Sequence, residues 1–76
     1  MSVNHIDKII SSIAKVIDEP IKNITINSKS IDFKKWDSLA HVRIIIEIER
    51  ITKKKIAVSK VAELLSVKAI SDYISK

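Results

Sequence analysis

The chain has 76 residues, 46% of them hydrophobic and 30% charged, so it is long enough for one small domain with one core and too apolar to stay disordered. It contains no cysteine, which excludes disulfides, thiolate metal sites and a built-in thiol nucleophile. The net charge of +5 raises the hypothesis of a nucleic-acid or membrane-surface partner.

The first predicted element is a helix of about four turns within residues 3–18. Its apolar residues recur at i, i+3, i+4, i+7, i+10 and i+11, which is one stripe on a helix. Ser2 or Asn4 is a candidate N-cap, and Pro20 is expected to end the helix because it disfavours helical geometry at Glu19. Since the chain has no glycine, helix ends must use Asn, Lys or Pro instead. The stripe consists of Ile6, Ile9, Ile10, Ile13, Val16 and Ile17.

Residues 21–36 lack helical periodicity and are predicted to form a long loop. The stretch KNITIN alternates like a strand, but no second strand is available to pair with it. Loops of this length in small domains are usually functional or anchored. We expect apolar side chains to anchor it to the core, namely Ile21, Ile24, Ile26, Ile31, Phe33 and Trp36.

The second long helix is predicted to begin at Asp37 or Ser38 and to end near Lys53. At 100° per residue it carries one wide apolar face and a separate apolar strip, with Arg43, Glu47 and Arg50 between them. One face is enough to bury a helix, so the strip is either a docking surface or is covered by the long loop. The face consists of Ile44, Ile45, Ile48 and Ile51, and the strip of Leu39, Val42 and Ile46.

Two shorter helices follow. Ser59 is a candidate cap for a turn or two carrying Val61, Leu64 and Leu65, and Ser66 is a candidate cap for a last helix carrying Val67, Ile70 and Ile74. The predicted fold is a small all-α bundle with the order long helix, long loop, long helix, short helix, helix. Residues 1–76 are expected to form a single domain.

Ser38 is the candidate functional residue. It and Asp37 both qualify as helix caps, but if Asp37 caps the helix, Ser38 is free to point outward from the first turn. Unpaired N–H groups and the helix dipole favour an anion there, so a phosphate ester on Ser38 would be well placed.

Nucleophilic catalysis by Ser38 is disfavoured, because a serine nucleophile needs an oriented base and oxyanion donors. His41 lies one turn away, but no acid is evident to orient it, and on the helical wheel it leans toward Ile45 and Ile48 at the mouth of the core. The chain has only two histidines, distant in sequence, so we expect no metal site and no enzymatic activity.

The Asp37-Ser38-Leu39 motif, opening a helix in an all-α chain of this length, resembles the motif of the acyl carrier proteins, which bear phosphopantetheine. With a tryptophan, Trp36, directly before the motif, the chain resembles the free-standing carriers of specialised pathways. The family's hydrophobic pattern can be followed from Asp37 to Ile74, while the N-terminal half matches in layout, with Ile31-Asp32-Phe33 as a loose loop anchor. Matching positions are Val42, Ile44, Ile45, Ile48, Ile56, Val61, Leu64, Val67, Ala69 and Asp72-Tyr73-Ile74.

The resemblance implies that a phosphopantetheinyl transferase attaches 4'-phosphopantetheine from coenzyme A to Ser38, and that the thiol of this arm carries an acyl or aminoacyl group. A chain without cysteine needs such a cofactor for thioester chemistry. It also implies partners such as an acyl- or aminoacyl-activating enzyme, an acyltransferase or a synthase. Partner docking is expected at Leu39, Val42, Arg43, Ile46 and Arg50, and contact with the acyl group or arm at His41, Ile45 and Ile48.

The charge of the second helix departs from the family, whose members are typically acidic there and dock on basic patches. Ala40, Arg43 and Arg50 replace acidic positions, and residues 34–55 hold seven basic and three acidic residues. Because charge sets partner choice, we predict weak docking to ordinary fatty-acid synthesis enzymes and dedicated partners with neutral or acidic surfaces.

Two other functions stay open at this point. A basic helical nucleic-acid binder would account for the charge and for the cluster Lys53–Lys55, although basic residues are spread out and the helix exposes apolar groups. An interaction module with an unmodified Ser38 would account for the surplus strip.

No apolar run exceeds three residues and the N-terminus is polar, so we expect no membrane span and no signal peptide. The expected protein is a cytoplasmic monomer.

Overall fold

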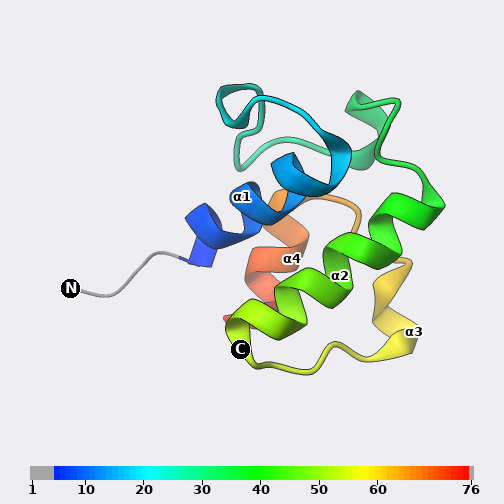
Figure 1. The fold of residues 1–76 in the computed structure, drawn as a ribbon. Helices are drawn as coiled ribbons and strands as arrows, with labels where there is room; N and C mark the ends of the chain where they lie inside the picture. The colour runs from blue at the N-terminus through cyan, green and yellow to red at the C-terminus, as the bar shows by residue number, and fades with distance from the viewer. Residues whose placement is uncertain (1–4, 76) are drawn as a thin grey trace.

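Helices account for all the regular structure in residues 5–75, the part of the chain that the computed structural model describes (Figure 1). Within that range there is no β-strand, only one isolated bridge between Lys29 and Ser66. The predicted all-α class and the order of its helices are therefore confirmed. The elements are α1 (His5–Ile17), the 3-10 helices η1 (Ile21–Asn23) and η2 (Ser30–Asp32), α2 (Ser38–Thr52), α3 (Val58–Val61) and α4 (Val67–Ile74).

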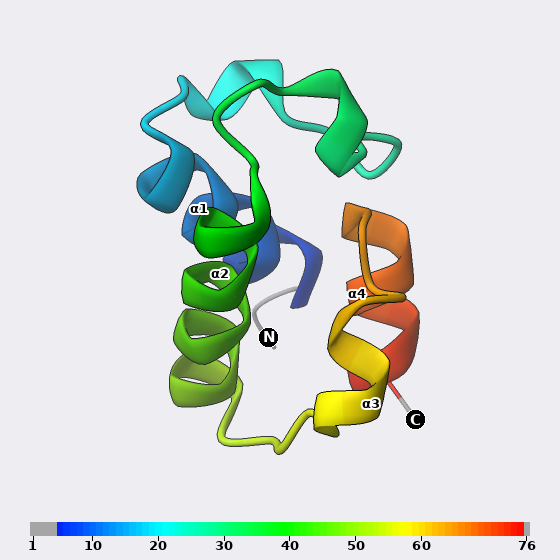
Figure 2. The same cartoon turned by 90° about the vertical axis from the view of Figure 1, so that its right-hand side faces the viewer.

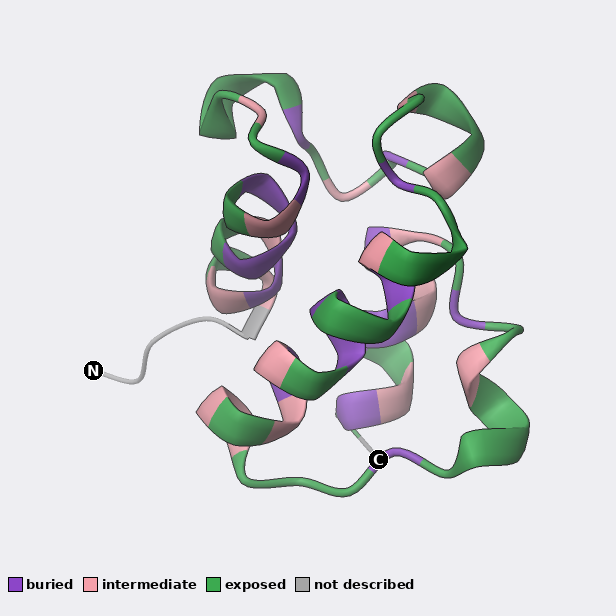
Figure 3. Cartoon of the chain, turned by 45° about the vertical axis from the view of Figure 1, so that its right-hand side comes forward, coloured by how far each residue is buried: buried purple, intermediate pink, exposed green. Residues whose placement is uncertain are grey.

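The core forms where α1 packs against both α2 and α4 (Figure 2). The predicted stripe of α1 faces this core, with Ile9, Ile13 and Ile17 fully buried and the other three members partly buried. The helices α1, α2 and α4 each turn a buried side inward and an exposed side outward (Figure 3). The buried members from the other long helices are Ile44, Ile45 and Ile48 of α2 and Val67, Ile70 and Ile74 of α4.

The long loop is held by fewer side chains than the sequence predicted. Ile24 and Trp36 are buried and Ile26 and Phe33 partly buried, but Ile21 is 54% and Ile31 87% exposed, so the prediction was wrong for these last two. Backbone hydrogen bonds complete the anchoring instead. Ser30 N–H donates to Leu65 O at 2.8 Å and Val67 N–H donates to Ser28 O at 3.0 Å, which joins the loop to the start of α4.

Two predicted helix boundaries need correction, and one is confirmed. The helix α1 ends at Ile17 because Asp18 takes a left-handed conformation with φ 55°, so the stop precedes Pro20. The helix α3 begins at Val58 after Ala57, which leaves Ser59 inside the helix rather than at its cap. Ser66 does cap α4, accepting a hydrogen bond from Ala69 N–H. The proposed caps Ser2 and Asn4 lie outside the described residues.

The helix α2 ends on Lys53, which takes a left-handed conformation with φ 58°. A side chain with a Cβ is disfavoured there, whereas glycine is not. We expect Lys53→Gly to stabilise the protein by about 0.5–1 kcal/mol in urea unfolding, because relief of this strain exceeds the entropy that glycine adds to the unfolded chain.

Lys55→Gly is the matched control, since Lys55 is an exposed loop residue without positive φ. There glycine brings only its entropic cost, so a slight loss of stability is expected. Equal losses in both variants would contradict the role given to Lys53.

Candidate functional site

The first turn of α2 shows which of the two candidate cap residues, Asp37 or Ser38, is the N-cap. Asp37 is the N-cap, and its Oδ1 accepts a hydrogen bond from Ala40 N–H at 2.9 Å. Ser38 is the first residue of the helix and is exposed. Its hydroxyl has no hydrogen-bond partner among residues 5–75, so it is available for chemistry with an outside molecule.

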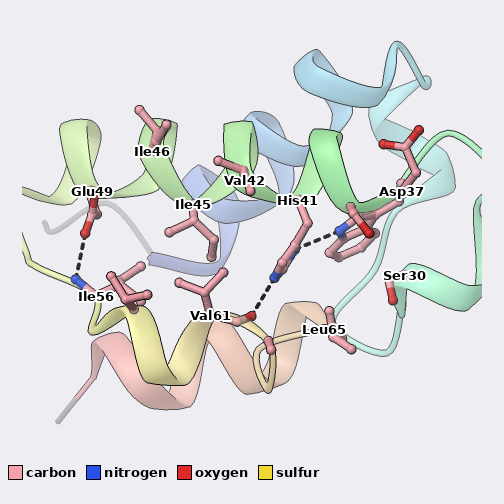
Figure 4. A pocket seen from close by; sticks show the side chains of 14 residues that line it. Ser30, Asp37, His41, Val42, Ile45, Ile46, Glu49, Ile56, Val61 and Leu65 are labelled. Atoms are coloured by element: carbon pink, nitrogen blue, oxygen red, sulfur yellow. Dashed lines mark hydrogen bonds between the residues drawn. The ribbon is translucent and has the colours of Figure 1, made fainter.

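Three residues after Ser38, the side chain of His41 points inward, and the residue is only 5% exposed. Its Nδ1 accepts a hydrogen bond from Trp36 Nε1–H at 3.0 Å, so the ring proton is on Nε2, which donates to Val61 O at 2.8 Å (Figure 4). The ring therefore ties the start of α2 to both the long loop and α3. With both nitrogens engaged, His41 has no free atom to take a proton from Ser38 in this arrangement.

An open groove of about 830 Å³ lies between α2 and the α3 segment, and Ser38 is on its wall. Most lining side chains are apolar, and Figure 4 shows Ile45 and His41 of α2 pointing toward Val61 of α3, whereas Ile46 points away from it. At the opposite end from Ser38, Glu49 accepts a hydrogen bond from Ile56 N–H at 2.8 Å, which holds the connection between the helices. The lining residues are Ser30, Trp36, Asp37, Ser38, His41, Val42, Ile45, Ile46, Glu49, Ile56, Val58, Val61, Ala62 and Leu65.

The predicted apolar strip on α2 is open to solvent. Leu39 is 65%, Val42 49% and Ile46 58% exposed, so the alternative in which the long loop covers the strip is wrong. Two more exposed apolar residues, Val58 and Leu65, face the groove from its other side. The exposed apolar surface therefore continues from α2 across the groove, and we call these five residues the groove face.

Charged groups border the groove face on its α1 side. Glu47 is bound by Arg50, three residues along α2, and by Lys15 of α1 at 3.6 Å. The hydrogen bond from Arg50 keeps the pKa of the Glu47 carboxyl below its ordinary value, and the charge of Lys15 adds to the effect. The same hydrogen bond raises the pKa of Arg50. Arg43 is exposed between the strip and this cluster.

The structure brings most of the predicted site residues together at the groove. His41, Val42, Ile45 and Ile46 line it with Asp37 and Ser38. Four predicted residues do not line it: Ile48 lies in the core, and Leu39, Arg43 and Arg50 lie outside the groove. Sequence reasoning missed the wall opposite α2, which comes from Val58, Val61, Ala62 and Leu65. A helix of four residues shows no periodicity, so only the exposure of Val58 and Leu65 after folding identifies that wall.

Comparison with known proteins gives no assignment: no protein-family model matches the chain, and a search of curated proteins finds no match. Across residues 5–75, no helix is both long enough and apolar enough to cross a bilayer. The same range holds no group of three or more His, Cys, Asp or Glu side chains able to bind a metal ion. The geometry and chemistry of the site are therefore the basis for inferring function.

Proposed function

We propose that this protein is an acyl carrier protein of a dedicated pathway, with 4'-phosphopantetheine attached to Ser38. The observation that carries the proposal is the position of Ser38, exposed at the first turn of α2 and on the wall of a large apolar groove. The Asp37-Ser38-Leu39 motif supports it from the sequence, and the order of long helix, long loop, long helix, short helix and last helix is the one that the resemblance leads us to expect. The proposal places the protein in the cytoplasm, where coenzyme A is available.

The residues around Ser38 fit the attachment reaction. The Ser38 oxygen would attack the phosphorus of the phosphopantetheine moiety of coenzyme A, and the bond from that phosphorus to the adenosine bisphosphate would break. The leaving group is adenosine 3',5'-bisphosphate, and a base of the transferase would take the hydroxyl proton. Since Asp37 serves as cap and His41 is engaged elsewhere, the hydroxyl enters this reaction without losing a contact that stabilises the fold.

The groove supports a carried group with an apolar chain. The arm would supply the thiol that this cysteine-free chain lacks. Ser38 and Glu49 are eleven positions apart on α2, which corresponds to about 16 Å of helix and gives the groove's length. Side chains such as Val42, Ile45 and Val61 would exclude water from a chain lying between α2 and α3.

The test is intact mass after incubation with coenzyme A, magnesium and a broad-specificity phosphopantetheinyl transferase. We expect the wild type to gain one phosphopantetheinyl group and Ser38→Ala to gain none. Ser59→Ala is the matched control, since it removes another exposed serine near a helix start and should leave modification intact. A transferase that modifies a known carrier but leaves the wild type unmodified would refute the proposal.

A second function, an interaction module with an unmodified Ser38, is favoured by one observation. The groove face is exposed in the protein without any attached group, as expected of a surface that binds a partner directly. Failure of the mass experiment, together with partner binding that Ser38→Ala does not change, would select this function.

A further inference from the structure

All three carboxylates between residues 34 and 55 are engaged within the protein. Asp37 caps α2, Glu47 is bound by Arg50 and Lys15, and Glu49 accepts a hydrogen bond from Ile56 N–H. Glu47 is the one paired with cations, whereas Asp37 and Glu49 bind backbone N–H groups and keep their negative charge. The region keeps an excess of positive charge, with seven basic residues against these three carboxylates.

The cations of the same region are engaged less completely. Arg50 is paired with Glu47, Lys35 lies 4.0 Å from Asp18, and Lys54 donates to Ile74 O at 2.8 Å. Among the described residues, the remaining four have no ion-pair partner. These are Lys34, Arg43, Lys53 and Lys55.

Arg43 is the free cation best placed to affect docking. It is four residues after Leu39 and three before Ile46, so it lies on the same side of α2 as the exposed strip. A partner that covers Leu39 and Ile46 must also cover or border the Arg43 guanidinium. Burying that cation without a counter-charge is unfavourable, whereas a carboxylate at the rim is favourable.

We propose that the groove face docks a protein partner whose contact surface is apolar and flanked by carboxylates, and that Arg43 selects for this negative charge. The inference deepens the proposed function, and rests on it for the partner's role as an enzyme that acts on the carried group. The charge preference, in contrast, is a property of the surface alone and is testable on the unmodified protein.

The probes are two synthetic amphipathic helical peptides with the same leucine face, one flanked by glutamates and the other by lysines. Titration calorimetry at low and high salt measures the binding of each to the unmodified protein. We expect the acidic peptide to bind more tightly, with an affinity that falls as salt is added, and the basic peptide to bind weakly. Amide NMR shifts on binding should centre on residues 39–46.

Arg43→Glu should weaken binding of the acidic peptide about fivefold at low salt, because one rim attraction becomes a repulsion. Lys68→Glu is the matched control, since it changes the net charge equally on α4, which lies across the molecule from α2 (Figure 2). It should leave the affinity within about twofold, since the Coulomb energy falls with the distance between the charges. Ile46→Ser should weaken the binding of both peptides.

Equal effects of Arg43→Glu and Lys68→Glu would show attraction by net charge alone and would overturn the proposal. Tighter binding of the basic peptide would overturn it as well. These outcomes are independent of phosphopantetheine transfer, because no transferase or coenzyme A is present in the titration. A failed mass experiment and a failed titration are therefore distinguishable.

Discussion

Ile44→Ala is expected to destabilise the protein by about 3–4 kcal/mol, a large part of the total stability of a domain this size, which is about 4–11 kcal/mol. Ile44 has no exposed surface and belongs to the cluster in which α1, α2 and α4 meet. Removing three carbons there leaves a cavity that the surrounding isoleucines cannot fill without shifting their helices. Urea unfolding followed by circular dichroism measures the change.

The matched control is Ile46→Ala, which makes the same substitution two residues away on the same helix. Ile46 is 58% exposed, so its loss should change stability by no more than about 0.5 kcal/mol. The two variants also separate folding from docking, since Ile46→Ala should remain folded and lose affinity for the acidic peptide. Similar losses of stability would mean that the two sides of α2 are not distinguished as described.

His41→Ala is expected to lower the free energy of unfolding by about 3 kcal/mol. The substitution removes a buried ring and leaves Trp36 Nε1–H and Val61 O without their hydrogen-bond partner. Because Val61 belongs to α3, the loss should also loosen that helix. We expect the substitution to speed amide hydrogen exchange more in residues 58–64 than in α1. It should also lower the urea concentration at the midpoint of unfolding.

A double-mutant cycle with Trp36→Phe isolates the hydrogen bond between the two rings, since phenylalanine keeps the apolar ring and removes the N–H. Once either residue is replaced the hydrogen bond is lost, so the second substitution lowers the stability by less than it does in the wild type. That difference, the coupling energy, should be about 1 kcal/mol. Purely additive losses would show that His41 contributes through packing and its contact with Val61 alone.

Periodic segments account for what the sequence predicted well. The stripe of α1 and the two sides of α2 follow from helical geometry, because each residue's direction is set by its position in the repeat. The same geometry placed Leu39, Val42 and Ile46 on a strip apart from the core face and turned His41 toward the core. The structure confirms the burial of His41 and decides that the strip is exposed, which the sequence had left open. The choice of Asp37 as cap was open, and the structure decides it.

Aperiodic segments account for the errors. Ile31 belongs to a 3-10 helix of three residues, whose direction is set by the hydrogen bond from Lys29 N–H to Asp32 and by the backbone bonds to the start of α4. No pattern in residues 21–36 encodes those distant contacts. The partners of His41 were hidden for a similar reason, since one of them is a backbone carbonyl twenty residues away. Half of the groove therefore depends on packing rather than on local sequence.

Trp36, which is hydrogen-bonded to His41, gives the protein an intrinsic fluorescence signal. Trp36 is the only tryptophan in the chain, is 4% exposed, and lines the groove near Ser38. Indole emission responds to the polarity and hydrogen bonding around the ring, so a chain entering the groove should change its intensity and wavelength. Under the proposed carrier function, loading, release and transfer of a carried group should be measurable by stopped-flow fluorescence on the unlabelled protein.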